Sequence, residues 1–496
     1  MRTDTAIRYK PRMPSRDYQL EACARMRGRH AFALTMYMRT GKSKTLLDDF
    51  GAMELAGEVE DLLIIAPAGV YLTWMTAIQD HVSDDLAKRL RVHTWTSGPG
   101  KKQRADLQDF LHDMTRPRAF LVNVEALSTT TGAREAVEEF LAPRRSMAAV
   151  DESTIIKNHK AERTKFVCRV VAPRADYRRI LSGLPTPRSP LDLYCQYEFL
   201  DLSILRQASY FGFMHRYAIV KKTDFGGRLK RPAHIVVGYR NEDELRRLTE
   251  PHSFRVEFRP DIPSTYSFRE VALSKEQARI YAEMKRHATA EIEAASHVTA
   301  SLVIVKMLRL HQILCGHVVD EQGVEHEIPE CRTQAVLDIL DDYSGKAVIW
   351  CSYDADIRKV SAAIAEEYTT EDPETGEKKP GKVARFWGGN VRTREEEERM
   401  FQADPECRWM VATPDAGGRG RTWDAADLVI FYSSKNNLEH RDQAESRTQN
   451  VGKARGVDYI DLICPGTVDG AIIKALRDKI DMASAITGSD WRQWLI

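Results

Sequence analysis

Two series of short apolar runs, each alternating with helix-like stretches, constrain the fold of this chain most strongly. The first series lies within the first two hundred residues, and its runs are AFALTM at 31–36, LLIIAPA at 62–68, AFLVNV at 119–124, MAAV at 147–150 and RRILSG at 178–183. The second series comprises AVIWCSY at 347–353, VARFWGG at 383–389, WMVAT at 409–413, LVIFYS at 428–433 and VDYIDLI at 457–463. This rhythm is typical of parallel sheets wrapped by helices. The sequence therefore predicts an α/β fold with two separate sheets.

The stretch between the two series has a different character. It contains long helical patterns, KEQARIYAEMKRHATAEIEAA at 275–295 and LVIVKMLRLHQIL at 302–314. We therefore predict a first lobe at 1–200, helical protrusions and a linker at 201–330, and a second lobe with a C-terminal brace at 331–496. A chain of 496 residues is long enough for about three such units.

A candidate phosphate-binding loop follows the first apolar run, in MYMRTGKSKT at 36–45. A tight turn ending in Gly41 would present backbone N–H groups to anionic oxygens, Lys42 would add a positive charge, and Ser43 would offer its hydroxyl to a metal. A helix beginning near Lys42 would also favour phosphate through its dipole. The general P-loop pattern requires an earlier glycine where Met36 stands. The loop alone is therefore equally consistent with a helix cap.

An acidic pair strengthens the interpretation of that loop. Asp151 and Glu152 close the apolar run at 147–150, where one carboxylate could reach Mg²⁺ through water while its neighbour orients an attacking water. Such a pair also fits a solvated turn. Its order and distance after the loop, however, are those of nucleotide-hydrolysing proteins with RecA-like folds. Together the two motifs predict a site for the phosphates of a nucleotide and their magnesium ion.

The composition bears on whether the chain binds nucleic acid, forms disulfides or enters a membrane. Lysine and arginine number 73 against 72 acidic residues, so the formal charge of +1 gives no sign of a nucleic-acid partner. Local basic patches, each of which also fits a solvated surface, are Lys101, Lys102 and Arg104, then Lys221, Lys222, Arg228, Lys230 and Arg231. The eight cysteines show no C-x-x-C spacing, which favours reduced thiols. No apolar run approaches the roughly 20 residues of a membrane span, and we expect a soluble cytoplasmic protein without a membrane partner.

Seven segments in order carry a family resemblance. Asp17, Tyr18 and Gln19 precede the phosphate loop and resemble the Q-motif that reads adenine. The others are APAGVYLTW at 66–74 (motif Ia), VDESTIIKN at 150–158 (motif II), LSGLPTPRSPLDLY at 181–194 (motif III), MLRLHQILCG at 307–316 (the helix that opens the second lobe), ATPDAGGRG at 412–420 (motif V) and QAESRTQNVG at 443–452 (motif VI). The chain thereby resembles a Swi/Snf-type member of helicase superfamily 2, in the compact form of phage and bacterial members.

This resemblance implies two RecA-like lobes that use ATP and Mg²⁺ to move along double-stranded DNA, including branched DNA, as a monomer. It implies that ATP is bound by Tyr18, Gln19, Arg39, Thr40, Gly41, Lys42, Ser43, Gly418 and Gln443. It assigns catalysis to Lys42, Asp151, Glu152 and Arg447, with Ser43 and Asp151 on the metal. The implied DNA contacts, mainly to phosphates, are Pro67, Thr73, Asn123, Ser352, Tyr353 and Thr413. Thr73 and Thr413 also fit as strand or cap residues.

Motif VI departs from the family pattern. Asn450 stands at the position of the second arginine of the motif, which in the family is normally the arginine finger. Lys453 stands at the position of the final glutamine. Loss of an arginine finger costs on the order of 10³-fold or more in rate. The cations that could replace it are Arg39, Arg441, Arg447 and Arg455. Arg39 occupies a position where many relatives have glycine, and its side chain would either reach the nucleotide or point to solvent.

Three functions remain open from the sequence. The leading one is a DNA-stimulated ATPase that translocates on duplex DNA and remodels forks, recombination intermediates or bound proteins. A second is an ATP-binding clamp or scaffold on DNA with weak or no hydrolysis, because Asn450 replaces the finger. A third is a helicase that separates strands of DNA or RNA. Comparing duplex DNA, single-stranded DNA and RNA as activators of hydrolysis distinguishes them.

Overall fold

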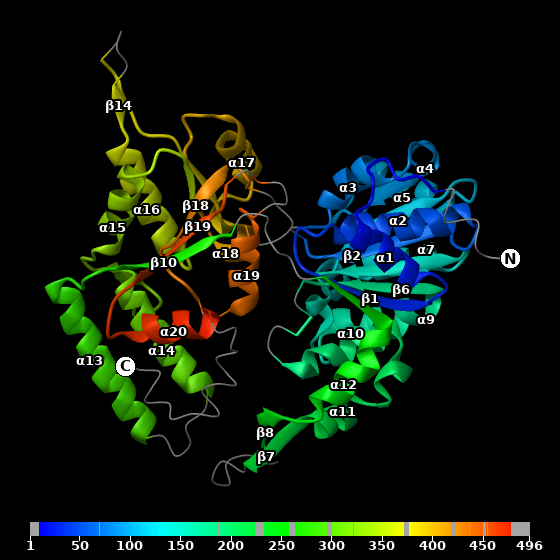
Figure 1. The fold of residues 1–496 in the computed structure, drawn as a ribbon, viewed down its shortest axis with the longest axis horizontal. Helices are drawn as coiled ribbons and strands as arrows, with labels where there is room; N and C mark the ends of the chain where they lie inside the picture. The colour runs from blue at the N-terminus through cyan, green and yellow to red at the C-terminus, as the bar shows by residue number, and fades with distance from the viewer. Residues whose placement is uncertain are drawn as a thin grey trace. The chain divides into compact units, whose positions relative to one another are not determined.

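The computed structural model shows two compact units, unit 1 with Met1–Ile219 and Tyr239–Arg259, and unit 2 with Val220–Gly238 and Pro260–Ile496 (Figure 1). The middle segment predicted at 201–330 is thus shared between both units. The structure describes residues 9–68, 70–183, 185–186, 189–223, 233–256, 263–294, 300–320, 322–371, 376–417, 423–435, 437–449, 453 and 455–477. The predicted residues outside these ranges are Arg228, Lys230, Arg231, Gly418 and Asn450.

Unit 1 is built on a seven-stranded sheet in the order β3-β4-β2-β5-β6-β1-β9, and all neighbouring strands are parallel. The strands are β1 (Ala31–Met36), β2 (Asp61–Ala66), β3 (Arg91–Thr94), β4 (Arg118–Asn123), β5 (Ser146–Asp151), β6 (Tyr177–Leu181) and β9 (Ser253–Val256). The five strands predicted for this sheet are confirmed within two residues at each end. The edge strands β3 and β9 were not predicted.

Helices cover both faces of this sheet, which explains why most residues of its central strands are apolar. On one face, Phe32 and Leu34 of β1 pack with Leu46 of α2 and Trp74 of α3. On the other, the ring of Phe120 in β4 contacts aromatic rings of α5 and α7. The helices are α1 (Asp17–Met26), α2 (Lys42–Leu55), α3 (Thr73–His81), α4 (Asp84–Arg89), α5 (Lys101–His112), α6 (Ala126–Thr129), α7 (Thr131–Leu141), α8 (Glu162–Phe166), α9 (Ala172–Arg174), α10 (Leu193–Leu200), α11 (Tyr210–Tyr217) and α12 (Glu242–Thr249).

Unit 2 contains a six-stranded parallel sheet in the order β10-β19-β18-β13-β17-β16. Its strands are β10 (Thr265–Glu270), β13 (Lys346–Trp350), β16 (Val383–Phe386), β17 (Trp409–Ala412), β18 (Ala426–Phe431) and β19 (Asp458–Ile463). Each run of the second predicted series overlaps one of these strands, with starts that agree within two residues. The unpredicted strand, β10, comes from the middle segment and pairs with β19. The two sheets confirm the predicted α/β fold with two RecA-like lobes.

Unit 2 also has helices on both faces of its sheet. Ile349 of β13 packs in a cluster with α14, α15, α16 and α20, whereas Trp350 packs in a second cluster with α17 and α19. The helices are α13 (Lys275–Ala294), α14 (Ala300–Leu314), α15 (Arg332–Asp341), α16 (Asp354–Glu367), α17 (Arg394–Ala403), α18 (Pro414–Gly417), α19 (Leu438–Ser446) and α20 (Val468–Arg477). Helices α13 and α14 confirm the two long helical patterns predicted for the middle segment.

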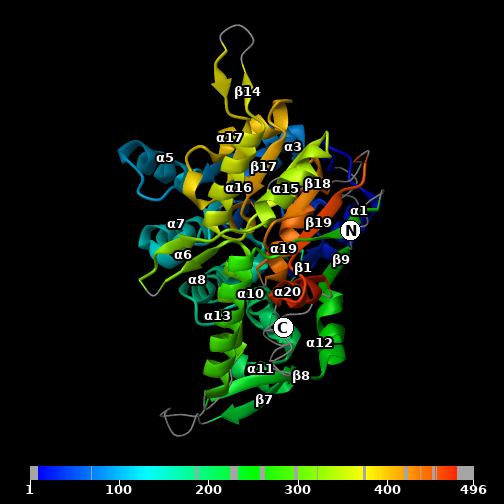
Figure 2. The ribbon, with the colours of Figure 1, turned by 90° about the vertical axis from the view of Figure 1, so that its left-hand side faces the viewer.

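Three short two-stranded sheets complete the described structure. They are formed by β7 (Ala218–Thr223) with β8 (Ala233–Tyr239), β11 (His317–Val319) with β12 (Glu325–Glu327), and β14 (Thr370–Glu371) with β15 (Lys378–Lys379). The β14–β15 pair projects from the end of α16 (Figure 2). None of the helices in the described ranges is both long and apolar enough to span a membrane.

Candidate nucleotide site

The candidate phosphate loop connects the end of β1 to the start of α2. Gly41 caps the helix with φ 82°, a left-handed conformation that glycine adopts without strain. The hydroxyl of Thr40 donates to the carbonyl of Tyr37 over 2.6 Å, which tightens the turn. The first N–H groups of a helix have no partner within the helix, so the turn leaves those of α2 able to bind an anion. Lys42 and Ser43 are the first two helical residues and are half-buried.

The loop is held in place from two sides. The carboxamide of Gln19 donates to the carbonyl of Thr40 over 3.1 Å and accepts from the backbone of Arg16 over 2.9 Å. It lies so close to Gly41 that a Cβ at that position would clash with its nitrogen. On the other side, a Cβ added at Gly183 would lie 3.3 Å from Met38. The Q-motif and motif III therefore fix the shape of the loop.

The predicted acid lies at the same edge of the sheet as the loop. β5 ends at Asp151 and is separated from β1 by β6 alone. Asp151 is 6% exposed, and its carboxylate accepts hydrogen bonds from the indole of Trp74 at 3.0 Å and from the backbone of Glu152 at 2.9 Å. Burial, followed by the neighbouring Glu152, raises the pKa of Asp151 to about 6, and the positive charge of Lys42 opposes this shift. The structure thus brings Lys42 and Asp151 near each other at this edge of the sheet.

Backbone strain is concentrated at this site. In the described ranges, four residues other than glycine have a positive φ, namely Arg39 (67°), Glu152 (47°), Arg206 (53°) and Asn241 (57°). Two of them belong to the phosphate loop and the acidic motif. A left-handed backbone costs a residue with a side chain roughly 1–2 kcal/mol. Such strain persists only where the surroundings enforce it, and it is common at functional sites.

A buried link that the sequence did not reveal joins motif II to motif III. The hydroxyl of Ser153 donates to Oε1 of Gln196 in α10 over 2.5 Å. The amide nitrogen of Gln196 donates to the carbonyls of Pro185 at 2.7 Å and Asp192 at 2.8 Å. Gln196 is fully buried, so this contact fixes the segment after β6 relative to the acidic motif. A buried amide outside any motif carries no sequence pattern that could have identified it.

The predicted DNA-contacting residues of unit 1 gather at the carboxyl ends of β2 and β4. Pro67 follows β2, whose last residue pairs with Asn123 at the end of β4. The hydroxyl of Thr73, at the start of α3, donates to the carbonyl of Val70 over 2.7 Å. The amide oxygen of Asn123 accepts from the backbone of Ala126 over 2.8 Å. Both side chains therefore have local partners in addition to any external one.

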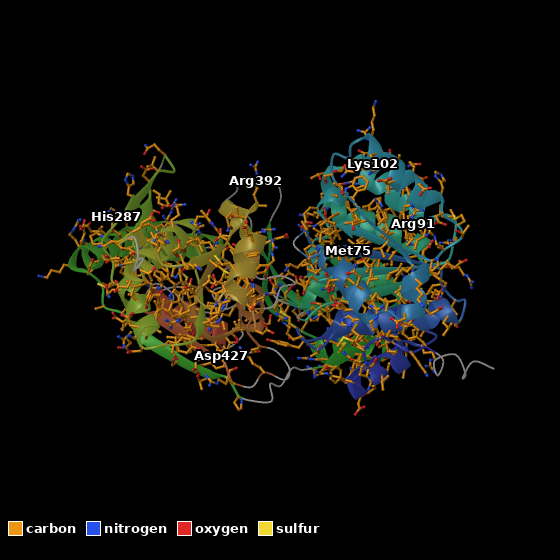
Figure 3. The ribbon with its side chains drawn as sticks, turned by 90° about the horizontal axis from the view of Figure 1, so that it is seen from above. Met75, Arg91, Lys102, His287, Arg392 and Asp427 are labelled. Atoms are coloured by element: carbon orange, nitrogen blue, oxygen red, sulfur yellow. The ribbon has the colours of Figure 1, made fainter. Side chains whose placement is uncertain are left out.

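The predicted basic patch on α5 is a separate surface feature. Lys101, Lys102 and Arg104 are all exposed, and Lys102 extends away from the helix (Figure 3). The guanidinium of Arg104 donates to the carbonyl of Pro99 over 3.0 Å. The patch is therefore accessible, but nothing in the described structure connects it to the phosphate loop.

In unit 2, the predicted DNA-contacting residues follow β13 and β17. Ser352 is buried, and its hydroxyl donates to the carbonyl of Ser433 over 3.0 Å. The phenol of Tyr353 lies 2.8 Å from Nδ1 of His311. The hydroxyl of Thr413, which is also buried, accepts from the backbone of Ala416 over 3.4 Å. All three hydroxyls therefore have partners within the protein.

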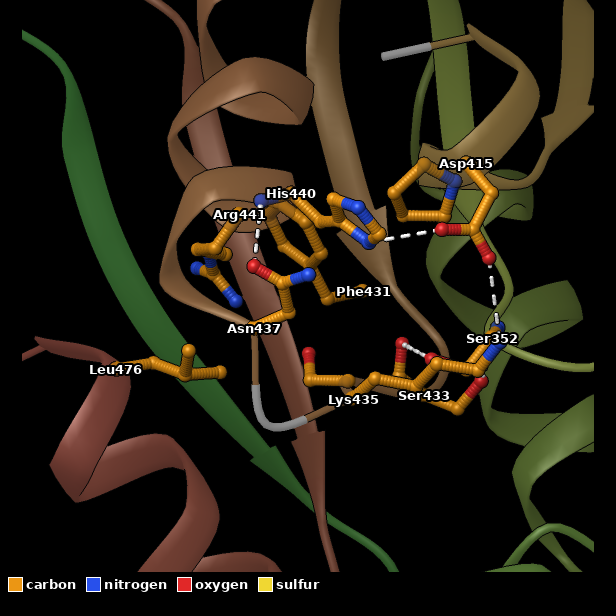
Figure 4. A pocket seen from close by; sticks show the side chains of 11 residues that line it. Ser352, Asp415, Phe431, Ser433, Lys435, Asn437, His440, Arg441 and Leu476 are labelled. Carbon is orange, nitrogen blue, oxygen red and sulfur yellow. Dashed lines mark hydrogen bonds and ion pairs between the residues drawn. The ribbon is translucent and has the colours of Figure 1, made fainter. Parts of the chain in front are cut away.

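A hollow lies at this edge of the second sheet (Figure 4). Its lining includes Ser352, Asp415, Lys435 and His440. The carboxylate of Asp415 lies 2.8 Å from Nδ1 of His440 and 3.3 Å from Nζ of Lys435. The hydrogen bond from His440 is the main reason that the pKa of Asp415 lies well below its usual range. The positive charge of Lys435 in the hollow is thus partly neutralised by this carboxylate.

The motif VI segment occupies α19 and the residues after it. Gln443 and Arg447 are buried. Arg441, one of the cations considered as a replacement finger, donates to Asp461 at 2.5 and 3.1 Å and to Glu445 at 2.6 Å. These bonds engage its guanidinium within unit 2. Lys453 is also engaged, with Asp427 at 2.8 Å.

Two models of known protein families match this chain. Residues 34–318 match the SNF2-related domain, and residues 331–452 match the helicase conserved C-terminal domain. The first match alone covers more than half of the chain. This chain belongs to the SNF2-related family. The resemblance identified from the motifs is therefore confirmed, and with it the relationship to helicase-like ATPases.

The relatives are distant in sequence. The "Putative ATP-dependent helicase/translocase YwqA" of Bacillus subtilis is 23% identical over 446 residues, which cover 86% of this chain and 43% of YwqA. The "Chromatin-remodeling ATPase INO80" of Mycosarcoma maydis is 33% identical over 89 residues, which cover 18% of this chain and 5% of that protein. The chain thus spans less than half the length of these curated relatives. A solved structure, "Sulfolobus solfataricus SWI2/SNF2 ATPase core in complex with dsDNA", is 20% identical, with a TM-score of 0.41 and coverage of 98% of this chain and 97% of that one.

Proposed function

We propose that this protein is a DNA-stimulated ATPase that moves along duplex DNA and remodels forks, recombination intermediates or bound proteins in the cytoplasm of a bacterial or phage-infected cell. The observation that carries the proposal is the meeting of Lys42 with Asp151 at one edge of a parallel sheet, beside a helix N-terminus. Nucleotide phosphates bind at such positions. The names of the SNF2-related relatives, a helicase/translocase and a remodelling ATPase, support the class of reaction.

Each residue of the unit 1 site has a proposed role. Lys42 binds the phosphates as a point charge, and Tyr18 with Gln19 reads the base. Ser43 and Asp151 offer a hydroxyl and a carboxylate, which are the oxygen ligands that Mg²⁺ prefers, so these residues fit the ion that the family uses. When bound, Mg²⁺ supplies positive charge to the phosphate oxygens.

Glu152 is proposed to orient the attacking water and to accept its proton. Arg39 and Thr40 of the loop are proposed to contact the nucleotide, as are Gln443, Arg447 and Gly418, the last of which lies outside the described residues. Arg447 is proposed as the catalytic cation of motif VI.

The proposed partner is double-stranded DNA, bound by a monomer. Contacts near Pro67, Thr73 and Asn123 in unit 1, and near Ser352, Tyr353 and Thr413 in unit 2, would involve neighbouring backbone N–H groups as much as side chains. Pro67 has no N–H group of its own, and the hydroxyls already have partners. Contacts to phosphates do not depend on the DNA sequence. They also agree with a chain whose formal charge is only +1.

Phosphate release from ATP, measured with duplex DNA, single-stranded DNA, RNA or no nucleic acid, tests the proposal. Stimulation by duplex DNA is expected, with no turnover in Lys42→Ala and with ATP binding but no turnover in Glu152→Gln. Full activity of Lys42→Ala would refute the site. ATP-dependent DNA binding without phosphate release would instead establish a clamp, and selective stimulation by RNA would establish an RNA helicase.

A further inference from the structure

The chain that leads to the Q-motif runs along α2 and touches it at three successive places. The ring of Tyr9 lies so close to Gly51 that a Cβ at that glycine would clash with it. Ser15 makes hydrogen bonds to the first half of the helix. Gln19 lies against Gly41, which caps the helix. The segment therefore follows α2 from its C-terminal half toward the phosphate loop, and its position along the helix determines where Gln19 stands.

The middle contact is a closed triangle of hydrogen bonds, which we call the Ser15 clamp and which consists of Ser15, Lys44 and Asp48. The ammonium of Lys44 donates to Oδ2 of Asp48 at 2.6 Å and to the hydroxyl of Ser15 at 2.7 Å. The hydroxyl of Ser15 in turn donates to the same Oδ2 at 2.7 Å. Lys44 is 6% exposed and Asp48 is 5% exposed. The hydroxyl thus acts as acceptor and donor at once toward a buried ion pair.

Stability alone gives no reason for a buried ion pair here. Removing two charges from water costs about as much as their attraction returns, and well-packed apolar residues of similar size stabilise a fold equally or better. What the pair adds is geometry. A hydroxyl that must both accept from an ammonium and donate to a carboxylate fits one position along the helix. A shift of the segment by one residue would leave the buried charges without that partner.

We propose that the Ser15 clamp determines selectivity for adenine by fixing the register of the Q-motif segment against the phosphate loop. This inference rests on the proposed function, in which Gln19 reads the base. Gln19 uses one amide hydrogen on Thr40 and one lone pair on Arg16. The carboxamide therefore retains one donor and one acceptor, which match the N7 acceptor and N6 donor of adenine but not the two acceptors of guanine.

Selectivity, not affinity alone, is the property that tests the clamp. Titration calorimetry with Mg²⁺ measures the dissociation constants of ADP, GDP and pyrophosphate for the full-length chain. In Ser15→Ala, which leaves the ion pair in place, the preference for ADP over GDP should fall about tenfold, equivalent to the loss of one good hydrogen bond. Pyrophosphate has no base, so its affinity should fall less than that of ADP; any loss it does show reports the contact of Gln19 with the phosphate loop. An unchanged ADP preference, or an equal loss for all three ligands, would overturn the proposal.

A matched control lies on the same helix. Asp49 is 4% exposed, and its carboxylate accepts from Nε of Arg179 at 2.9 Å, so this buried ion pair runs to β6 and not to Ser15. Asp48→Asn and Asp49→Asn should both lower the melting temperature, but Asp48→Asn alone should lower the preference for ADP over GDP. Equal effects of both variants on the preference would show that loss of stability is the cause, and the proposal would fail.

Two further variants distinguish an error in the Ser15 clamp from an error in the base-reading role of Gln19. The double variant Lys44→Met/Asp48→Leu restores apolar packing without a partner for Ser15, and should be stable yet weakly selective; full selectivity would contradict the clamp. Gln19→Ala should also lose selectivity. If Gln19→Ala keeps it, the base-reading role within the proposed function is wrong. If Gln19→Ala loses selectivity while Ser15→Ala retains it, the clamp alone is wrong.

Discussion

The indole N–H of Trp74 donates a hydrogen bond to Oδ2 of Asp151 over 3.0 Å. Trp74 is 1% exposed, so this bond connects α3 to the acidic end of β5 in a nearly dry environment. A hydrogen bond to a charged group contributes about 1.5–3 kcal/mol. We expect Trp74→Phe to lower the apparent Mg²⁺ affinity in ATP hydrolysis about tenfold or more, because the carboxylate loses both a stabilising donor and its orientation. Magnesium titration of the turnover rate measures this.

Trp95→Phe is the control for that change. Trp95 is 4% exposed, and its indole nitrogen has no hydrogen-bond partner within the described ranges. The same substitution there removes the same N–H group without loss of a bond. Its Mg²⁺ dependence should equal that of the wild type. If both variants lose Mg²⁺ affinity equally, the Trp74 bond is not the cause.

The raised pKa of Asp151 predicts a pH dependence of metal binding. A proton and Mg²⁺ compete for the carboxylate, and burial with the nearby Glu152 brings the pKa to about 6. The Mg²⁺ affinity measured with ADP should therefore fall as the pH decreases through about 6, approaching tenfold per pH unit. In Asp151→Asn only the weaker pH dependence that comes from protonation of the ADP phosphate, whose pKa is about 6, should remain. A wild-type transition near pH 4 would contradict the raised pKa.

The raised pKa of Asp151 also predicts how the stability of the ligand-free protein depends on pH. Because the pKa rises from 3.8 to about 6 on folding, the stabilisation from protonated Asp151 is complete below pH about 4 and is lost as the pH rises through about 6. At pH 8, Asp151→Asn should therefore be more stable than the wild type, by up to about 3 kcal/mol. Urea unfolding at pH 4 and pH 8 measures the difference, which should vanish at pH 4.

Substitution of Arg39 distinguishes the energetic cost of its backbone conformation from its proposed contact with the nucleotide. Its φ of 67° disfavours any side chain, so Arg39→Gly should raise the free energy of unfolding by up to about 1 kcal/mol. If Arg39 contacts the nucleotide as proposed, ATP turnover should nevertheless fall about tenfold. Arg206, with φ 53°, is an exposed arginine outside the site, so Arg206→Gly should gain stability at unchanged turnover. Intact turnover in Arg39→Gly would remove Arg39 from the site.

Asp61 stabilises the edge of the sheet opposite the site. It is fully buried at the start of β2, and it accepts hydrogen bonds from Arg118 and Arg144. Asp61→Asn should cost about 3–5 kcal/mol, because the fully buried Arg118 loses its counter-charge. Nucleotide affinity, measured well below the melting temperature, should not change. For comparison, Glu21→Gln breaks an exposed pair with Arg25 and should cost at most about 0.5 kcal/mol.

The central strands were predictable because burial on both faces leaves a local pattern. AFALTM and MAAV correspond to β1 and β5 within a residue, since nearly all of their residues are apolar and pack under helices. The edge strand β10 has no such pattern, because all of its residues are exposed. Its partner, β19, lies about 190 residues further along the chain. Neighbouring residues could not indicate that pairing.

The residue types of the site were likewise evident from the sequence, but their partners were not. Lys42 begins α2 just after β1, and Asp151 ends β5. Their approach depends on the strand order, which the structure supplies. Lys44 looks like an ordinary surface lysine in the sequence, and only tertiary packing showed that it is buried against Ser15. Hydrogen bonds between residues distant in the chain depend on how helices are seated on a sheet, and no local pattern encodes that.

The sequence by itself determined that this chain has two parallel sheets, and it located the candidate phosphate loop and the acidic motif, because apolar periodicity and turn chemistry are local properties. The tertiary structure alone decided that Trp74 holds Asp151, that Gln19 closes on Gly41, and that Arg39 is held in a left-handed backbone. These contacts arise from the packing of α1, α2 and α3 on one face of the first sheet. Their energies depend on burial, which only the folded chain creates.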